Sequence, residues 1–345
     1  MLWSVPTVCT VLLLFQVVNE YPVVLSENRD TSLAKYVKIA RVNYQALADR
    51  PPKLFYPPAL APDAMCDPAS PAPVPFVGPF DVTNATWVGV NQHRVVLAVT
   101  NGYVPHPEPS AATRSRGVLA VEVLNSATSA QNARDLIEAA LNSGEYKSSN
   151  FLVADAEQAW VIHYWGEAVE VCSLNPGIHV FGNYYFPDPH PGDGSDAVLE
   201  WLVDDTRIRM ERGAELVGSI PEFQERSMSK LDSLAGIRAF ITDHSGEPGR
   251  GISICRHAVD PRDYRERRTL SNTTICLHSE FLEQSSIYYN AGNPCAHKWQ
   301  DRSFLLEPEN FTCQFLEGEG EGTGGSGQNR EGESIPQFGK FPSER

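Results

Sequence analysis

The chain has 345 residues, of which 42% are hydrophobic and 10% aromatic, enough apolar side chains for a large buried core. Its formal net charge is −15 and it has no run of lysine and arginine, which argues against a nucleic-acid binder because phosphate binding needs a basic face. The seven cysteines are an odd number without the spacing of a disulfide framework. They indicate reduced thiols and a cytoplasmic protein.

The first 18 residues are apolar but do not have the features of a targeting segment. The first basic residue is Arg29, so the positive region of a signal peptide is missing, and no small-x-small cleavage site follows. The run VLLLF is too short for a membrane span, which takes about 20 residues. We therefore expect a buried strand here and no membrane span.

Turn residues at 19–22 predict a hairpin between this strand and a short second strand, Val23–Leu25, which the polar residues 26–30 close. The proline-rich stretch 51–79 predicts a surface loop, since it cannot be the interior of a helix. A second hairpin is predicted at 86–101 with its turn at 91–93. A helix is expected at about 129–142, started by a capping box of Thr128 and Gln131 and ended near Gly144.

Further strands are predicted at 151–155, 159–165, 168–174 and 178–183, followed by a helix over about 196–217 and strands at 251–255, 273–278 and 287–289. Consecutive hairpins with helices grouped between them favour an α+β architecture with stacked sheets. Residues 316–345 form an acidic tail rich in Gly and Glu that we expect to be disordered. One domain over residues 9–315 is therefore expected.

Cys9, at the start of the first strand, is the candidate nucleophile. In an N-terminal nucleophile, the first residue of the mature chain supplies both the thiol and the base, because a free α-amino group titrates near 7.7–8. A hairpin folds Asp30 back beside Cys9, so its carboxylate can hold and orient the ammonium group.

Several short segments occur in an order that resembles the NRDE family, which includes the eukaryotic transport and Golgi organization protein 2. These segments are CTVLLLF at Cys9, ENRD at 27–30, TWVGVNQHRVVLAVTN at 86–101, SRG at 115–117, NFLVAD at 150–155, PGIHVFGN at 176–183 and ICRH at 254–257. The resemblance implies the αββα four-layer sandwich of N-terminal-nucleophile hydrolases. The chain is more distantly similar to choloylglycine hydrolases and penicillin V acylases.

This resemblance implies that Cys9 is the nucleophile, that Asp30 orients the amine, and that Asn101 and Asn183 help form the oxyanion hole and position the substrate. It implies that Asn28, Arg29 and Arg116 bind substrate or support the site. The chain differs from the pattern at two places. Glu27 stands where the hydrolases have an arginine, and Thr31 follows the aspartate where the NRDE family has an acidic residue.

Two functions remain open at this point. The first is an amidohydrolase or acyltransferase acting on a small-molecule amide with a non-peptide C–N bond, which needs no cofactor. The second is a carrier or trafficking protein, linked to haem or lipid handling and Golgi organisation, that uses the same fold without turnover.

The eight residues before Cys9 would block its amine. We expect either that they are removed as a leader, or that translation starts at Val8 from a GTG codon, which would restore a Met-Cys start.

Cys-x-His pairs occur at 255/257, 276/278 and 295/297, with irregular spacing between the pairs. We therefore expect no metal site, and we interpret the segment 243–245, Asp-His-Ser, as a polar loop.

Overall fold

The computed structural model describes residues 9–31, 54–55, 74–81, 85–102, 114–166, 168–183, 197–225, 227–244, 253–257 and 268–307. The expected leader at 1–8, the acidic tail and most of the proline-rich stretch lie outside these residues. Within the described part, no helix is long and apolar enough to cross a membrane.

The described strands form two sheets in which every pairing is antiparallel. The first sheet has the order β10-β1-β2-β11-β12-β13. Its strands are β1 Thr10–Phe15, β2 Val23–Thr31, β10 Gly177–Phe181, β11 Arg268–Leu277, β12 Ser286–Ala291 and β13 Gln300–Asp301.

The second sheet runs in chain order from β3 to β9. Its strands are β3 Leu54–Phe55, β4 Phe76–Pro79, β5 Val88–Asn91, β6 Val96–Asn101, β7 Ser149–Ala154, β8 Ala159–Tyr164 and β9 Val169–Ser173. The helices are α3 Arg116–Leu124, α4 Ala130–Leu141, α5 Ala197–Ser219 and α6 Lys230–Ile241, with 3-10 turns η2 Pro221–Gln224, η3 Leu282–Gln284 and η4 Ser303–Leu306.

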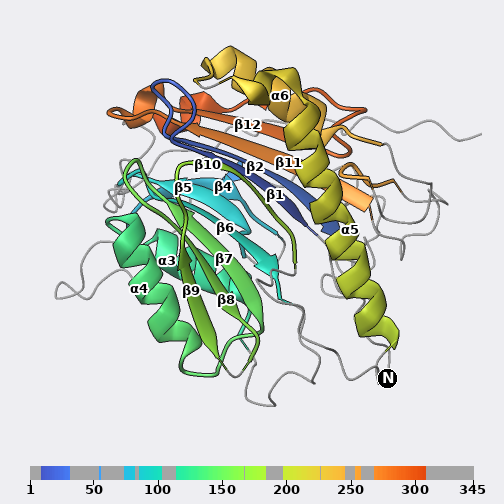
Figure 1. The fold of residues 1–345 in the computed structure, drawn as a ribbon. Coiled ribbons are helices and arrows are strands. Elements are labelled where there is room, and N and C mark those ends of the chain that lie inside the picture. Colours follow the sequence, from blue (N-terminus) through green and yellow to red (C-terminus); the bar gives the residue numbers. More distant parts are fainter. Residues whose placement is uncertain are drawn as a thin grey trace, which may run out of the picture. The chain divides into compact units, whose positions relative to one another are not determined.

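Side-chain alternation along β1 and β2 divides the interior into two cores. Leu13 and Leu25 belong to a core that also contains the second sheet and residues of α3 and α4. Leu12 and Val24 point to the other face and pack with residues of α5 and α6. The layers are therefore α3 and α4, the second sheet, the first sheet, and α5 and α6 (Figure 1).

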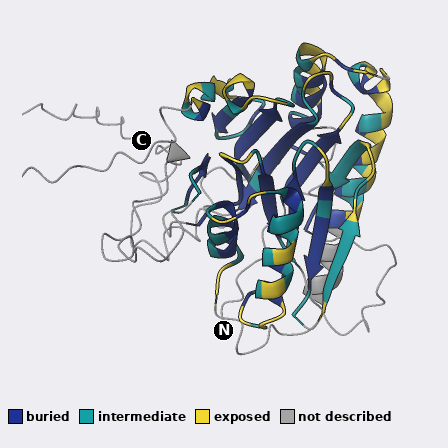
Figure 2. Cartoon of the chain, turned by 90° about the vertical axis from the view of Figure 1, so that its left-hand side faces the viewer, coloured by how far each residue is buried: buried dark blue, intermediate teal, exposed yellow. Residues whose placement is uncertain are grey.

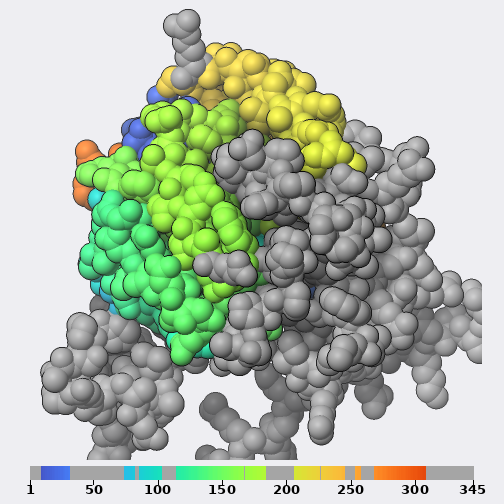
Figure 3. All heavy atoms as spheres, turned by 60° about the horizontal axis from the view of Figure 1, so that its bottom comes forward, coloured from blue at the N-terminus to red at the C-terminus, as the bar shows by residue number. Residues whose placement is uncertain are grey.

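Burial follows these layers. The strands of both sheets are mostly buried, and the helices carry the exposed residues on their outer faces (Figure 2). The space-filling view shows α4 (green) and α5 and α6 (yellow) at the surface (Figure 3). The four-layer α+β sandwich implied by the resemblance is confirmed.

Several predicted elements need correction. Strand β2 does not end at Leu25 but continues to Thr31, because the polar residues 26–31 pair with β1 and β11. Residues 76–79, predicted as loop, form β4, with Pro79 as the last residue of the strand, where a missing N–H is tolerated. Residues 253–255 of the strand predicted at 251–255 form bends, and 251–252 lie outside the described residues.

Two helices, α3 and α6, were not predicted. The cap of α4 lies one residue later than expected: the Ser129 side chain, not that of Thr128, accepts from the N–H of Asn132. Strand β10 follows β9 in the chain but pairs with β1 in the other sheet. The chain thus changes layers between β9 and β10, and this places Asn183 beside the start of β1.

Candidate active site

Cys9 lies directly before β1 and is 6% exposed. Thr10 is paired with Asn28, so the thiol of Cys9 lies beside the second half of β2. The main-chain N–H of Cys9 donates to Oδ1 of Asn183, and the main-chain N–H of Asp30 is hydrogen-bonded to the Cys9 sulfur. The nitrogen that would become the free amine is therefore held by an amide side chain.

A polar network extends from Asn183 into the second sheet. Asn183 Nδ2 donates to the carbonyl oxygen of Asn101 at 3.0 Å. Asn150 Nδ2 donates to the Asn183 carbonyl oxygen at 2.9 Å and to Thr100 Oγ1 at 3.2 Å. These bonds fix the orientation of the Asn150 amide, so its Oδ1 accepts from His163 Nδ1 at 2.8 Å. The network joins Cys9 to strands β6, β7 and β8.

A pocket between the two sheets opens against this network. Thr100, Asn150 and His163 form its polar part, and apolar side chains form the rest. The complete lining is Val11, Ala98, Thr100, Asn150, Phe151, Leu152, Val161, His163, Phe181 and Gly182. Its accessible volume is about 10 Å³, room for about one water molecule, so the described residues leave a small gap between the sheets beside the network.

Asp30 points to the opposite face of the first sheet. Its Oδ2 accepts from Arg209 Nη1 of α5 at 2.6 Å, and its Oδ1 accepts from Thr269 Oγ1 at 2.6 Å. The side chains of the ion pair are 0% and 2% exposed. Burial raises the pKa of the Asp30 carboxyl, and Arg209 and Thr269 act against this rise. The carboxylate is thus held from two directions beneath Cys9.

Asn28 has a structural position on the same face as Asp30. Its Nδ2 donates to the carbonyl oxygens of Ile241 and Ile254, both at 3.1 Å, and its Oδ1 accepts from Asn272 Nδ2 at 3.0 Å. It ties the end of α6 and the segment 253–257 to the sheet.

Arg29 lies on the face of β2 that points between the sheets. Its guanidinium is stacked 3.5 Å from the ring centre of Trp87 and lies 3.7 Å from Asp81 Oδ2. Glu27 points to the same side, is fully buried, and neither carboxyl oxygen has a hydrogen-bond partner among the described residues. Burial raises the pKa of Glu27 well above its ordinary value, and the positive charge of Arg29 opposes the rise.

The thiol and the imidazole of the site are both held in their neutral forms. Burial, followed by the charges of Glu27 and Asp30, raises the pKa of the Cys9 thiol to about 12. Burial lowers the pKa of His163 to about 4. A thiol of this kind reacts only when a base at short distance takes its proton.

Arg116 begins α3 and its guanidinium donates to the carbonyl oxygen of Ser148. The same oxygen accepts from the N–H of Gly102 at 3.0 Å, directly after Asn101. The structure thus links Arg116 to the Asn101 end of the site through Ser148.

The structure brings Cys9, Asn183 and the main chains of Asp30 and Asn101 together. The Asp30 carboxylate was expected to hold the amine of Cys9, but it points to the other face of the sheet, toward Arg209 and Thr269. The structure connects Asn28 and Arg116 to the surrounding framework. Asn150, His163, Arg209 and Thr269 were missed. A buried arginine in the middle of a helix and a threonine at the start of a strand give no local signal. Asn150 lies in NFLVAD, one of the segments that carry the family resemblance, but its residue type alone does not indicate a role.

The family model described as "Transport and Golgi organisation 2" matches residues 69–217 of the chain. The resemblance predicted from the sequence is confirmed over this range, which contains Asn101, Arg116, Asn150 and Asn183 but neither Cys9 nor Asp30. No curated protein matches the chain.

Three solved structures are similar to this chain. Penicillin V acylase from Agrobacterium tumefaciens has a TM-score of 0.46 and 12% identity, covering 87% of this chain and 89% of the acylase. A variant of the conjugated bile acid hydrolase from Clostridium perfringens has a TM-score of 0.48 and 13% identity, covering 85% and 96%. An N-acylethanolamine-hydrolyzing acid amidase ortholog from Caenorhabditis elegans has a TM-score of 0.43 and 13% identity, covering 78% and 92%.

Proposed function

The chain resembles the Transport and Golgi organisation 2 family, and from this premise we propose that it is a cysteine N-terminal-nucleophile amidohydrolase or acyltransferase acting on non-peptide C–N amide bonds. The observation that carries the proposal is the position of Cys9: its main-chain nitrogen is held by Asn183, and its thiol lies against the main chain of Asp30. The nucleophile and its base are then the same residue.

The reaction requires that the amine of Cys9 is free. A neutral α-amino group takes the proton of the Cys9 thiol, and the sulfur attacks the amide carbonyl carbon of the substrate. As the C–N bond breaks, the ammonium group returns the proton to the leaving nitrogen and a thioester remains. Water then releases the acid, or an acceptor amine takes the acyl group.

Asn183 and Asp30 have different roles in this proposal. Asn183 orients the amine, and together with Asn101 it is the proposed source of hydrogen bonds to the oxyanion. The charge of Asp30 favours the ammonium form that arises during the reaction. Arg209 and Thr269 fix that carboxylate, so they act as positioning residues.

Glu27 changes the expected substrate class. It stands where the related hydrolases have an arginine, so an anionic substrate would meet a buried carboxyl group beside the nucleophile. We therefore propose substrates that are neutral or cationic near the scissile amide.

The test compares a form that begins at Cys9 with its Cys9→Ala variant and with the chain in which Val8 still blocks the amine. Each is incubated with a panel of N-acyl amides, and intact mass reports the acyl-enzyme. Only the form with the free cysteine is expected to gain the mass of an acyl group. Asn183→Ala should lower the acylation rate about 10²–10³-fold.

A free Cys9 that forms no adduct with any amide would contradict the proposal. If the purified protein then carries haem or lipid, the carrier function takes its place. A Cys172→Ser variant serves as the control, because this half-buried thiol lies on β9, in the other sheet.

A further inference from the structure

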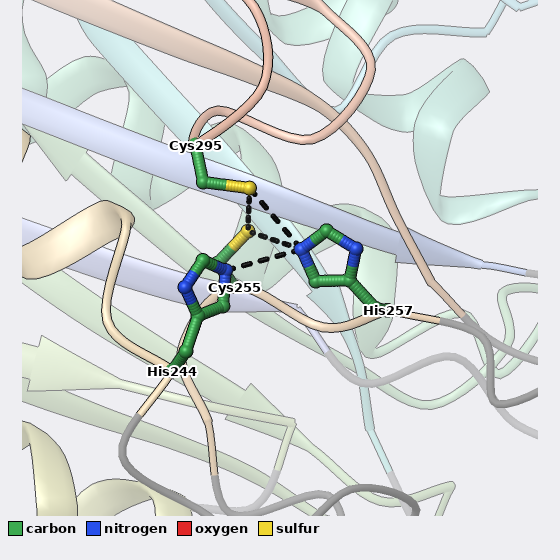
Figure 4. Close-up of side chains that lie close together, drawn as sticks. All are labelled: His244, Cys255, His257 and Cys295. Atoms are coloured by element: carbon green, nitrogen blue, oxygen red, sulfur yellow. Dashed lines mark hydrogen bonds between the residues drawn. The ribbon is translucent and has the colours of Figure 1, made fainter.

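Four side chains that can bind a metal ion converge near the Asp30 side of the first sheet. His244 follows α6, Cys255 and His257 lie in the segment 253–257, and Cys295 lies in the turn after β12 (Figure 4). Their ligand atoms all lie within 4.8 Å of one another. Cys255 is buried, Cys295 is half-buried, and the two histidines are exposed.

Four of the six separations between these atoms are close to the edges of a tetrahedron, and the other two are within 4.8 Å. The two sulfurs are 3.7 Å apart and the two Nε2 atoms are 3.1 Å apart. His257 Nε2 lies 3.7 Å from the Cys255 sulfur and 3.1 Å from the Cys295 sulfur. A tetrahedral zinc ion, with Zn–S of about 2.3 Å and Zn–N of about 2.0–2.1 Å, gives edges of about 3.8 Å between sulfurs, 3.3 Å between nitrogens and 3.6 Å between the two kinds.

We propose that His244, Cys255, His257 and Cys295 form a Zn²⁺ site of the closed, structural type. Four protein ligands leave no open position, and a Cys₂His₂ donor set is one that structural zinc prefers. The proposal replaces the expectation, drawn from the irregular Cys-x-His spacing, that the chain has no metal site.

The supporting contacts around the ligands are already in place. Asn293 Nδ2 lies 3.9 Å from the Cys255 sulfur and donates to the Arg256 carbonyl oxygen at 2.7 Å. The residue before His244, Asp243, is held by Arg212 of α5 at 2.9 Å, and the Asp243 carbonyl oxygen accepts from the N–H of Cys255 at 3.0 Å. Such contacts orient metal ligands and are part of a built site.

The site connects to the candidate active site through one residue. The N–H of Arg256, between the ligands Cys255 and His257, donates to Thr269 Oγ1 at 2.8 Å, and this hydroxyl donates to Asp30 at 2.6 Å. A bound ion would therefore fix the segment that positions Thr269 and, through it, the carboxylate of Asp30.

The test uses the full chain, freed of metal by a chelator under reducing conditions and titrated with Co²⁺ and then Zn²⁺. The wild type is expected to bind one ion per chain. Its Co²⁺ form should show the intense visible absorption of tetrahedral coordination and a thiolate charge-transfer band. Cys295→Ser and His257→Gln, which change a half-buried and an exposed side chain, should each weaken binding about 100-fold or more.

Matched controls are Cys172→Ser, a half-buried thiol on β9, and His93→Gln, an exposed imidazole in the turn after β5; both should bind as the wild type does. Circular dichroism verifies that each variant is folded. The proposal is overturned if the folded wild type binds no ion, or if Cys295→Ser and His257→Gln bind as well as the controls. A Cys255–Cys295 disulfide in the native protein would also overturn it.

Discussion

Asp30 and Arg209 form an ion pair that is closed off from solvent, with side-chain exposures of 0% and 2%. Arg209 remains charged in any environment, so removing the Asp30 carboxylate takes away the anion to which this buried guanidinium is bonded. We expect Asp30→Asn to lower the free energy of unfolding by about 3–5 kcal/mol in chemical denaturation. Asp30→Asn combined with Arg209→Met should recover part of this loss. A cost below about 1 kcal/mol for the single variant would contradict the assigned pairing.

His163 gives the stability a defined pH dependence. Its pKa is lowered by burial from 6.5 in the unfolded chain to about 4 in the folded protein. Between these two pH values the unfolded state binds a proton at His163 and the folded state does not. The contribution of His163 to the free energy of unfolding is therefore fully present above pH 6.5 and is lost as the pH falls toward 4. The loss should reach about 3 kcal/mol.

The measurement is the difference between the unfolding free energies of the wild type and His163→Gln across this pH range, since other groups titrate in both proteins. The free energy of unfolding of the wild type should decrease relative to that of His163→Gln as the pH falls from 6.5 toward 4. A difference that does not change with pH would show that the imidazole is already protonated or is reached by water.

At the scale of elements, α6 packs against the turn η2 through a glycine. A Cβ at Gly236 would lie 2.5 Å from the Phe223 ring, so no larger residue fits without movement. Alanine normally stabilises a helix interior by about 1 kcal/mol relative to glycine, but here we expect Gly236→Ala to destabilise by about 1–3 kcal/mol. Gly218 in α5 is the control, since a Cβ there meets nothing within 4 Å.

Gly218→Ala should accordingly be neutral or raise the midpoint of thermal unfolding slightly. The same behaviour of both variants would show that α6 lies farther from η2 than described. The prediction separates close packing from helix propensity, which act in opposite directions at Gly236 but not at Gly218.

The elements that could be predicted from sequence are those with a local signal. The hairpins β5–β6 and β7–β8 and the helices α4 and α5 follow from periodicity and turn residues. Helix α6 also has such a signal, since Ser229 and Asp232 form a reciprocal cap, but it was missed. The exchange of β10 into the other sheet has no local signal, because it depends on which edge is open when the layers assemble.

For the candidate site, proximity of Cys9 and Asp30 could be predicted because one hairpin joins them. The side to which Asp30 points could not, since its partners Arg209 and Thr269 are far away in the chain. The same holds for the four metal-binding side chains. His244 stood in a segment interpreted as a polar loop, and only the fold brings it to Cys255, His257 and Cys295.

For the molecule as a whole, the first sheet is shared by two cores. Leu12 and Leu13 are adjacent and fully buried, yet Leu12 packs toward α5 and α6 and Leu13 toward the second sheet. We expect Leu12→Ala and Leu13→Ala each to cost about 2–5 kcal/mol. Because β1 belongs to both cores, each variant should shift one common urea transition, observed alike by far-UV circular dichroism and tryptophan fluorescence.

Two separate transitions, one of them displaced by Leu12→Ala and the other by Leu13→Ala, would show instead that the two cores unfold independently. Sequence periodicity could predict that these leucines are buried. It could not assign each to a core, because that assignment depends on how the layers are stacked.

The order of strands in the first sheet also has a consequence for biosynthesis. The hairpin β1–β2 leaves the ribosome before its neighbours in the sheet, which are β10, residues 177–181, and β11, residues 268–277. Both edges of the hairpin therefore remain open while most of the chain is translated, and open apolar edges favour aggregation. The nascent chain should need a chaperone until residue 277 has emerged, and messages truncated before that point should yield insoluble product even though Cys9 and Asp30 are already present.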